Sequence, residues 1–204
     1  MKVVAILGTY RKGKFTDQIV DAVLSPIYEQ GHEVEKIFLM DQHIEFCTNC
    51  RKCMNDDPSL RMGECVTKDD MKSILQKMDE ADAMILASPM NIFTVTALMK
   101  KFIERLVPAI YWPWRKAYFP RLRIKRTGKR ALVLTSSAMP QIMLWIIAPG
   151  ILKIMRDAAR FMGYGKIKKK VFGFVGQNGS FTPTKKQVKK AHRLGKMLVN
   201  NKCS

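Results

Sequence analysis

Residues 1–30 constrain the fold of this chain more than any other stretch. Residues 1–8 (MKVVAILG) form an apolar run of the β type, and residues 9–16 (TYRKGKFT) form a short, basic loop that carries hydroxyl groups. From Thr16 onward, apolar residues recur at helical spacing. The order of these patterns predicts a strand, an anion-binding loop and a helix.

The loop has the chemistry of a phosphate site. A helix N-terminus presents unpaired N–H groups and a partial positive charge, both of which suit a phosphate. Thr9 and Thr16 add hydroxyl donors, Arg11 adds a guanidinium fork and Gly13 permits a tight turn. The loop is not a Walker A sequence, because Phe15 stands where that motif requires Ser or Thr, and it does not fit G-x-G-x-x-G either.

The following segments predict α/β organisation. A helix is expected from Thr16, as N-cap, to a stop at Gly31, and residues 32–40 read as a second strand. Two strands joined by a helix favour a right-handed β-α-β unit, and open sheets of this kind bind ligands at the carboxyl ends of their strands. A third buried strand is expected at residues 83–88, after a helix capped by Thr67 with Asp69 and Asp70 in its first turn.

Four cysteines lie close together between these segments. Cys47, Cys50, Cys53 and Cys65 have the spacing C-x2-C-x2-C-x11-C. Three thiols at two-residue spacing can wrap one iron-sulfur cubane, and a fourth can complete it, whereas zinc prefers two separated pairs or added His. The spacing therefore favours a [4Fe-4S] cluster over zinc, with free thiols as the alternative.

Three stretches carry a family resemblance. Residues 8–16, the cysteine stretch CTNCRKC…GECVTKDDM and the stretch ADAMILASPMNIFTVTALMKKFIER resemble, in the same order, the flavodoxin-like NAD(P)H-dependent FMN reductases and the iron-sulfur flavoproteins. The resemblance covers residues 1 to about 105. It implies a flavodoxin-like, doubly wound, five-stranded parallel sheet of order 2-1-3-4-5 with helices on both faces, and we expect a single domain over residues 1–204.

The resemblance also implies where FMN binds. The phosphate would contact Thr9, Arg11, Lys12, Lys14 and Thr16, in a loop that includes Phe15. The loop along the flavin ring would be Pro89, Met90, Asn91, Ile92 and Phe93, and Ser136 and Ser137 would supply the remaining edge. Asn91 stands where Tyr is usual in these families, and Phe93 stands where Gly is usual.

Two unusual segments follow. Residues 108–130 are basic and aromatic together, and we expect a protruding arm used for dimerisation or surface contact. Residues 139–155 are apolar nearly all round, too short to cross a bilayer once the preceding strand is subtracted, and are expected to form an exposed apolar helix.

Charge divides the chain sharply in two. Residues 1–100 carry 12 Lys and Arg against 15 Asp and Glu, whereas residues 101–204 carry 24 against 2. We therefore expect one side of the molecule to be strongly basic, with a homo-oligomer as the favoured partner and an anionic membrane surface as the alternative. Nucleic acid is a weaker expectation, because no recognised binding motif accompanies the charge.

The sequence thus favours an FMN-dependent oxidoreductase that passes hydride or electrons from NAD(P)H or a protein donor to an acceptor. An iron-sulfur flavoprotein with a [4Fe-4S] cluster is one alternative. A degenerate flavodoxin-like module that docks on a membrane or partner without redox activity is the other, suggested by Phe15, Asn91 and Phe93. The N-terminus lacks the features of a signal peptide, so we expect a cytoplasmic protein, peripheral at the membrane if it docks there.

Overall fold

The computed structural model describes residues 1–55, 57–112, 119–176, 179 and 181–200. The elements are, in chain order, β1 (Lys2–Leu7), α1 (Phe15–Glu29), β2 (Glu33–Phe38), η1 (Leu39–Asp41), α2 (Lys52–Asn55), α3 (Met71–Glu80), β3 (Ala83–Pro89), α4 (Ala97–Glu104), η2 (Val107–Ala109), β4 (Ile110–Tyr111), β5 (Arg121–Leu122), β6 (Thr127–Ser136), α5 (Gln141–Ile147), α6 (Pro149–Phe161), β7 (Tyr164–Phe172) and α7 (Lys185–Val199).

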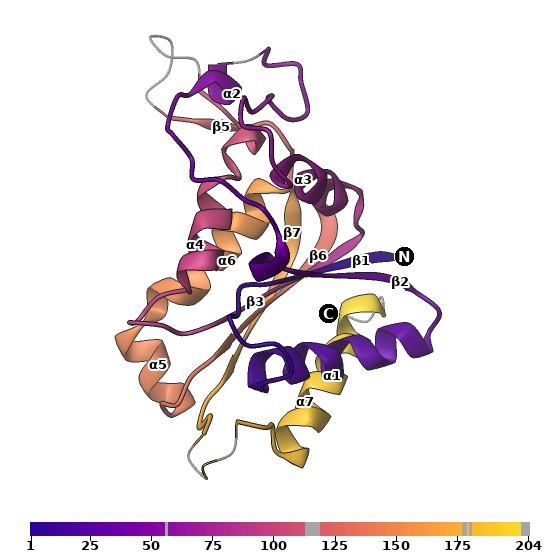
Figure 1. The fold of residues 1–204 in the computed structure, drawn as a ribbon. Coiled ribbons are helices and arrows are strands. Elements are labelled where there is room, and N and C mark those ends of the chain that lie inside the picture. The colour runs from indigo at the N-terminus through magenta and orange to yellow at the C-terminus, as the bar shows by residue number, and fades with distance from the viewer. Residues whose placement is uncertain (56, 113–118, 177–178, 180, 201–204) are drawn as a thin grey trace.

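The main sheet has five parallel strands in the order β2-β1-β3-β6-β7. This is the predicted order 2-1-3-4-5, so the prediction of a flavodoxin-like sheet is confirmed. Helices α1 and α7 cover one face, and α3, α4 and α6 cover the other (Figure 1). The chain reverses its direction of winding between β1 and β3, which opens a crevice beyond their carboxyl ends.

Strand β3 shows why both faces must be covered. Met84 and Leu86 enter one hydrophobic cluster, whereas Ala83, Ile85 and Ala87 enter the cluster on the opposite face. All five side chains are fully buried. A strand that is apolar on both faces is typical of a parallel sheet between two layers of helices.

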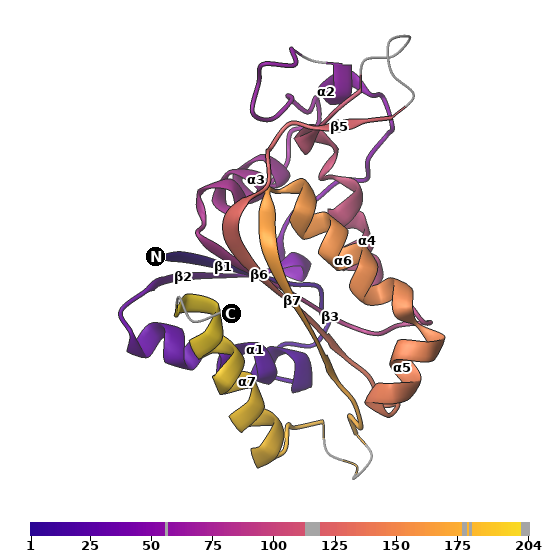
Figure 2. The same ribbon diagram turned by 180° about the vertical axis from the view of Figure 1, so that it is seen from behind.

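A projection at one end of the molecule joins the cysteine segment to the predicted arm. Figures 1 and 2 both show α2 and β5 together at the end furthest from α5. The backbone N–H of Trp112 donates to Met54 O at 3.0 Å, and the Arg123 guanidinium donates to Cys53 O at 3.3 Å. The described part of the arm is thus anchored on the cysteine segment of its own chain.

The end of the arm differs from the prediction. Strand β6 begins at Thr127, four residues before the expected start at Ala131, because residues 127–130 continue the pairing with β7 across a register shift. Residues 113–118, at the centre of the predicted arm, lie outside the described residues. Dimerisation through the arm stays a prediction.

The apolar segment 139–155 folds as two helices with different environments. In α5, Ile142 and Ile146 are 71% and 74% exposed, so the prediction of an exposed apolar helix is confirmed there. In α6, Ile151 and Met155 are buried against the sheet, and for this part the prediction is wrong. Among the described residues, no helix combines the length and apolar character needed to cross a membrane. Contact of α5 with a second copy or with a membrane stays a prediction.

A buried ion pair ties α3 to α4. The Arg105 guanidinium donates to both carboxylate oxygens of Asp69, at 2.5 and 3.1 Å, and the two side chains are 2% and 0% exposed. Asp69 also accepts from the backbone N–H groups of Glu45 and Met71. Burial by itself raises the pKa of Asp69, but the hydrogen bonds from Arg105 and the two N–H groups outweigh it and lower that pKa.

These contacts correct the prediction for the start of α3. The N-cap position is taken by Asp70, which makes no side-chain cap, and not by Thr67. Asp70 instead accepts from the backbone N–H of His43 at 2.7 Å. The two acidic residues therefore fasten the loop after β2 to α3, a long-range role that their position in sequence does not reveal.

Helix α7 packs very closely on α1. Thr184 and Gln187 form a capping box that begins the helix, and Ala191, Leu194 and Leu198 are buried beneath it. Val188, in the first turn of the same helix, is 40% exposed. A Cβ placed on Gly195 would lie 2.0 Å from Val23 O, so only glycine lets the two helices approach this far.

We predict that Gly195→Ala lowers the free energy of unfolding by about 1–3 kcal/mol, because α7 must move away from α1 or distort. Gly150→Ala is the matched control in α6, since a Cβ there meets nothing within 4 Å. The control should leave stability unchanged or raise it by up to about 1 kcal/mol, as alanine has the higher helix propensity. Urea unfolding followed by circular dichroism measures both, and equal effects would contradict the packing argument.

We predict that Asp69→Asn destabilises the fold by about 3 kcal/mol at pH 7, because Arg105 is left buried without its counter-charge. A carboxyl whose folded pKa is lowered adds stability above its unfolded pKa of about 3.9, and that stability is lost as pH falls through the folded pKa. The wild type should therefore lose more stability between pH 5 and pH 2 than the variant. Asp70→Asn is the comparison, because its half-buried carboxylate accepts from His43 N–H but forms no ion pair in the described part of the chain, and a pH profile for Asp69→Asn that parallels the wild type would refute the assignment.

Candidate functional site

A cavity of about 380 Å³ lies at the carboxyl edge of the sheet, where the loops after β1, β3, β6 and β7 meet. Ten of the thirteen residues predicted to contact a cofactor line it, and they are Thr9, Arg11, Lys14, Phe15, Thr16, Pro89, Met90, Asn91, Ser136 and Ser137. The structure thus brings together residues that lie up to 128 positions apart in the sequence.

The β1–α1 loop supplies one wall of this cavity. Helix α1 begins at Phe15, and its N-cap residue is Lys14, which makes no side-chain cap hydrogen bond. Thr16 is therefore inside the first turn and is not the N-cap that the sequence predicted. Gly13 has φ +68° and its N–H donates to Asp17 Oδ2 at 2.6 Å, which closes the loop tightly before the helix.

Four hydroxyl side chains in the lining are buried, namely those of Thr9, Thr16, Ser136 and Ser137. Thr16 Oγ1 and Ser136 Oγ lie 2.9 Å apart and join the loop after β1 to the end of β6. Arg11 and Lys14 are exposed cations at the same wall. Hydroxyls, two cations and an uncapped helix N-terminus form a donor set that fits a phosphoryl group.

The β3–α4 loop supplies the opposite wall. Met90 N–H donates to Ser136 O at 2.9 Å, and Asn91 and Thr94 exchange two backbone hydrogen bonds around a tight turn. The two central residues, Ile92 and Phe93, have φ +43° and +61°, a left-handed conformation that favours glycine. This geometry accounts for the glycine that the resembling families usually have at the position of Phe93.

Three predicted residues lie outside the cavity lining. Ile92 and Phe93 sit on the outside of the turn, 88% and 55% exposed, and do not cover the cavity as expected. Lys12 turns toward β2, where its ammonium pairs with Asp41 and lies 5.1 Å from the centre of the Phe38 ring. The apolar cover from this loop is supplied by Pro89 and Met90.

Four residues of the lining were not predicted from the sequence, namely Tyr10, Ala138, Val175 and Phe181. Phe181 is the most informative, because the Arg11 guanidinium lies 4.8 Å from the centre of its ring. Val175 and Phe181 follow β7, and the carboxyl end of every strand in a parallel sheet faces the same edge. That topological rule could have identified them.

The four clustered cysteines lie on the projection and are free thiols in this structure. Between them, Asn49 and Arg51 have left-handed backbones with φ +57° and +64°, so the chain turns sharply twice within this segment. Burial raises the pKa of Cys53 to about 11, and the charges of Cys65, Cys50 and Cys47 add to this effect. The four thiols are thus close enough to interact electrostatically.

Cys50 differs from Cys53 in its surroundings. It is exposed, and a backbone hydrogen bond at Lys52 lowers its pKa, which favours the thiolate form that binds metals. Within the described part of the chain, no three His, Cys, Asp or Glu side chains already converge on a metal position. The thiols therefore match a cubane cluster in number and type of donor, and not in a preassembled geometry.

Comparison with known proteins agrees with this geometry. The family model of NADPH-dependent FMN reductases matches residues 1–139, which include the first three cavity loops and all four clustered cysteines. An iron-sulfur flavoprotein of Archaeoglobus fulgidus is 40% identical over 119 residues, which make up 58% of this chain and 51% of the relative. An iron-sulfur flavoprotein of Methanocaldococcus jannaschii is 37% identical over 108 residues, or 53% of each chain. The chain spans about half the length of the curated relatives it matches.

Solved structures share the fold at low identity. An NAD(P)H:quinone oxidoreductase from Methanothermobacter marburgensis has a TM-score of 0.70 at 19% identity, over 97% of this chain and 98% of the other. This structural likeness extends beyond residue 139, where the match to the family model ends. The family match over residues 1–139, together with the cavity that these residues build, shows that the chain belongs to the NADPH-dependent FMN reductase family.

Proposed function

We propose that this protein is an FMN-dependent oxidoreductase that takes electrons from NAD(P)H and passes them to an acceptor. The observation that carries the proposal is the cavity at the carboxyl edge of the sheet, which gathers ten predicted cofactor residues from three loops. Its buried hydroxyl groups and two cations suit a phosphate, and Pro89 and Met90 suit the face of an aromatic ring.

In this proposal the role of each lining residue follows from its position in the cavity. Thr9, Arg11, Lys14 and Thr16 bind the phosphate at the start of α1, where the helix dipole adds to their charge. The link between Thr16 and Ser136 fixes the distance between the phosphate wall and the end of β6. Lys12, paired with Asp41, takes no part.

The chemistry is assigned to the cofactor and not to a side chain. Among the described residues that line the cavity there is no carboxyl group and no imidazole. Bound FMN would supply hydride and electron transfer, so the protein has only to bind it, orient it and cover its faces. This division agrees with a lining made of hydroxyls, cations and apolar side chains.

We further propose that Cys47, Cys50, Cys53 and Cys65 hold a [4Fe-4S] cluster, which would make the protein a carrier with two redox centres. The support is the number and spacing of the thiols, their mutual electrostatic influence and the names of the relatives that match this region. A cluster supplies one-electron transfer, which complements the two-electron chemistry of a flavin. Assembly would require the thiols to draw together around the metal.

We predict that Arg11→Gln weakens FMN binding by about ten-fold or more, because a charge-assisted hydrogen bond is worth about 1.5–3 kcal/mol. Lys12→Gln is the matched control, since it removes one positive charge from the same loop at a residue that pairs with Asp41. The control should change affinity by less than about two-fold. Quenching of FMN fluorescence during titration of the apoprotein measures both, and equal losses would contradict the assigned phosphate wall.

We predict that protein purified without oxygen shows flavin bands and a broad absorption that dithionite bleaches, with about four iron atoms per chain. Cys50→Ser should lose the broad absorption and the iron while it keeps FMN. Cys203→Ser, outside the predicted ligand set, should keep both. A Cys50→Ser protein with unchanged iron content, or a wild type that holds FMN without iron after anaerobic reconstitution, would rule out the cluster.

A further inference from the structure

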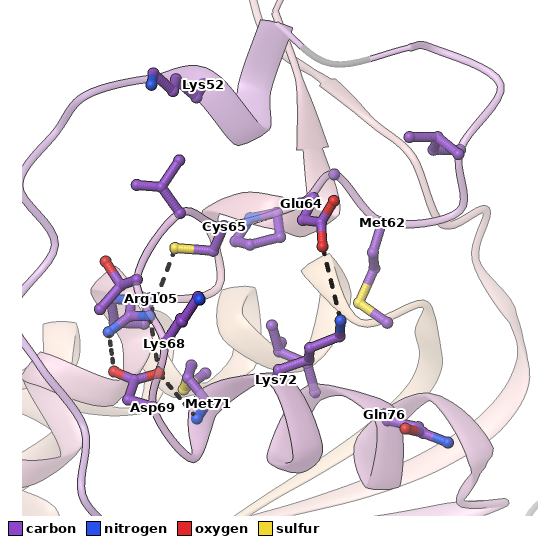
Figure 3. Close-up of a pocket in the computed structure, with 16 residues that line it drawn as sticks. Lys52, Met62, Glu64, Cys65, Lys68, Asp69, Met71, Lys72, Gln76 and Arg105 are labelled. Atoms are coloured by element: carbon purple, nitrogen blue, oxygen red, sulfur yellow. Dashed lines mark hydrogen bonds and ion pairs between the residues drawn. The ribbon is translucent and has the colours of Figure 1, made fainter.

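A second and larger cavity, of about 1090 Å³, lies between the segment that carries Cys65 and helix α3 (Figure 3). Residue 60 and residues 62–69 form one wall and α3 forms the other, and Lys52, Arg105 and Pro108 complete the lining. This cavity shares no lining residue with the cavity at the carboxyl edge of the sheet. Cys65 is part of its wall, so a molecule bound there would lie beside one of the four clustered thiols.

The wall facing α3 is held in place at three points. The Arg61 guanidinium donates to both oxygens of Asp79, at 2.6 and 2.7 Å. Gly63 N–H donates to Pro108 O at 2.8 Å, and Arg123 donates to the carbonyl oxygens of Asp57 and Leu60 at 2.5 and 3.2 Å. Residues 57–64 are thus fixed against the fold and hold one wall of the cavity in place.

Glycine is required at one of these points. A Cβ on Gly63 would lie 1.9 Å from Cys53 O. The segment therefore passes directly against the backbone of Cys53, and this close approach sets the depth of the cavity wall.

The lining offers apolar surface without a partner. Leu60 and Val66 are 41% and 52% exposed although they face the cavity, and Met62 and Leu75 continue the apolar surface toward the core. Figure 3 shows the segment that carries Cys65 and Met62 facing α3, so that a slot lies between two walls. A flat apolar body fits such a slot, and methionine adapts its shape to different ligands.

The charges of the lining are positive. Glu64 lies 3.7 Å from Lys72 and Asp69 is bound by Arg105, so both carboxylates are already paired. Lys52 and Lys68 also line the cavity, and neither forms an ion pair with a described residue. Lys52, Lys68, Lys72 and Arg105 against Glu64 and Asp69 give this lining a net charge of plus 2.

We propose that this cavity binds an anionic aromatic molecule, with a carboxylate or sulfonate held near Lys68 and a flat ring system between Val66 and Leu75. The negative group meets the unpaired ammonium, and the rings cover apolar side chains that water otherwise reaches. The site is independent of the proposed flavin chemistry, because its walls are complete without FMN.

Isothermal titration calorimetry of the purified full chain tests the proposal, with 2-naphthoate as the anionic probe and 2-naphthamide as its neutral counterpart. Excess FMN in both solutions keeps the cavity at the carboxyl edge filled. Lys68→Glu should weaken naphthoate binding by about ten-fold and naphthamide binding by less than about two-fold, because only the anion meets the reversed charge. Val66→Ser should weaken both probes, since it removes apolar cover.

Lys186→Glu on α7 is the matched control, because it makes the same change of charge at an exposed lysine on the opposite face of the sheet. It should leave both affinities within about two-fold of the wild type. Equal weakening of naphthoate by Lys68→Glu and Lys186→Glu would show that only net charge matters and would overturn the site. Absence of naphthoate binding to the wild type at millimolar concentration would overturn it as well.

Discussion

The buried ion pair between Arg105 and Asp69 connects helices α3 and α4 to the cysteine segment. Arg105 follows α4, Asp69 precedes α3, and the same guanidinium donates to Glu45 O at 2.7 Å and to Cys65 Sγ at 3.5 Å. One side chain thus joins the two helices on one face of the sheet to both ends of the cysteine segment. Because a buried guanidinium needs all of its partners, the cysteine segment and the parallel sheet cannot move independently at this point.

The cavity at the carboxyl edge of the sheet depends on a different constraint, which is the direction of the strands. Every loop that lines it follows the carboxyl end of a parallel strand, so the strand order alone brings Thr9, Pro89 and Ser136 to one edge. Apolar periodicity predicts the alternating strands and helices, whereas the strand order and most of this lining were expected from the resemblance of residues 1 to about 105 to a known family. The sequence could not predict the direction of each side chain within a loop. Lys12 has the charge expected of a phosphate ligand, yet Asp41 and Phe38 hold it away from the cavity.

The projection shows the opposite case, in which sequence patterns give little information. Its structure depends on contacts such as Arg123 with Cys53 O and Gly63 with Pro108 O, which join residues 45 to 70 positions apart. No periodicity marks such pairs, so the arm and the cysteine stretch read as two unrelated segments. The same limit explains why Thr67 was wrongly predicted to cap α3 and why the ion pair of Asp69 was not predicted. Capping rules consider only neighbours along the helix, whereas Asp69 pairs with the distant Arg105.

The turn between Asn91 and Thr94, at the cavity on the carboxyl edge, depends on both strand direction and long-range contacts. Its ends are fixed, since Thr96 Oγ1 donates to Gly8 O at 2.6 Å and Thr96 N–H donates to Ser88 Oγ at 3.2 Å. The chain must therefore reverse between Asn91 and Thr94, and Ile92 and Phe93 take left-handed backbones that cost energy for residues with a bulky side chain. Glycine would remove that cost, whereas Ile92 and Phe93 present exposed apolar surface at the cavity mouth. Helix α5, which follows another loop of the same edge, also exposes Ile142 and Ile146, so two loops of this edge place apolar side chains in contact with solvent.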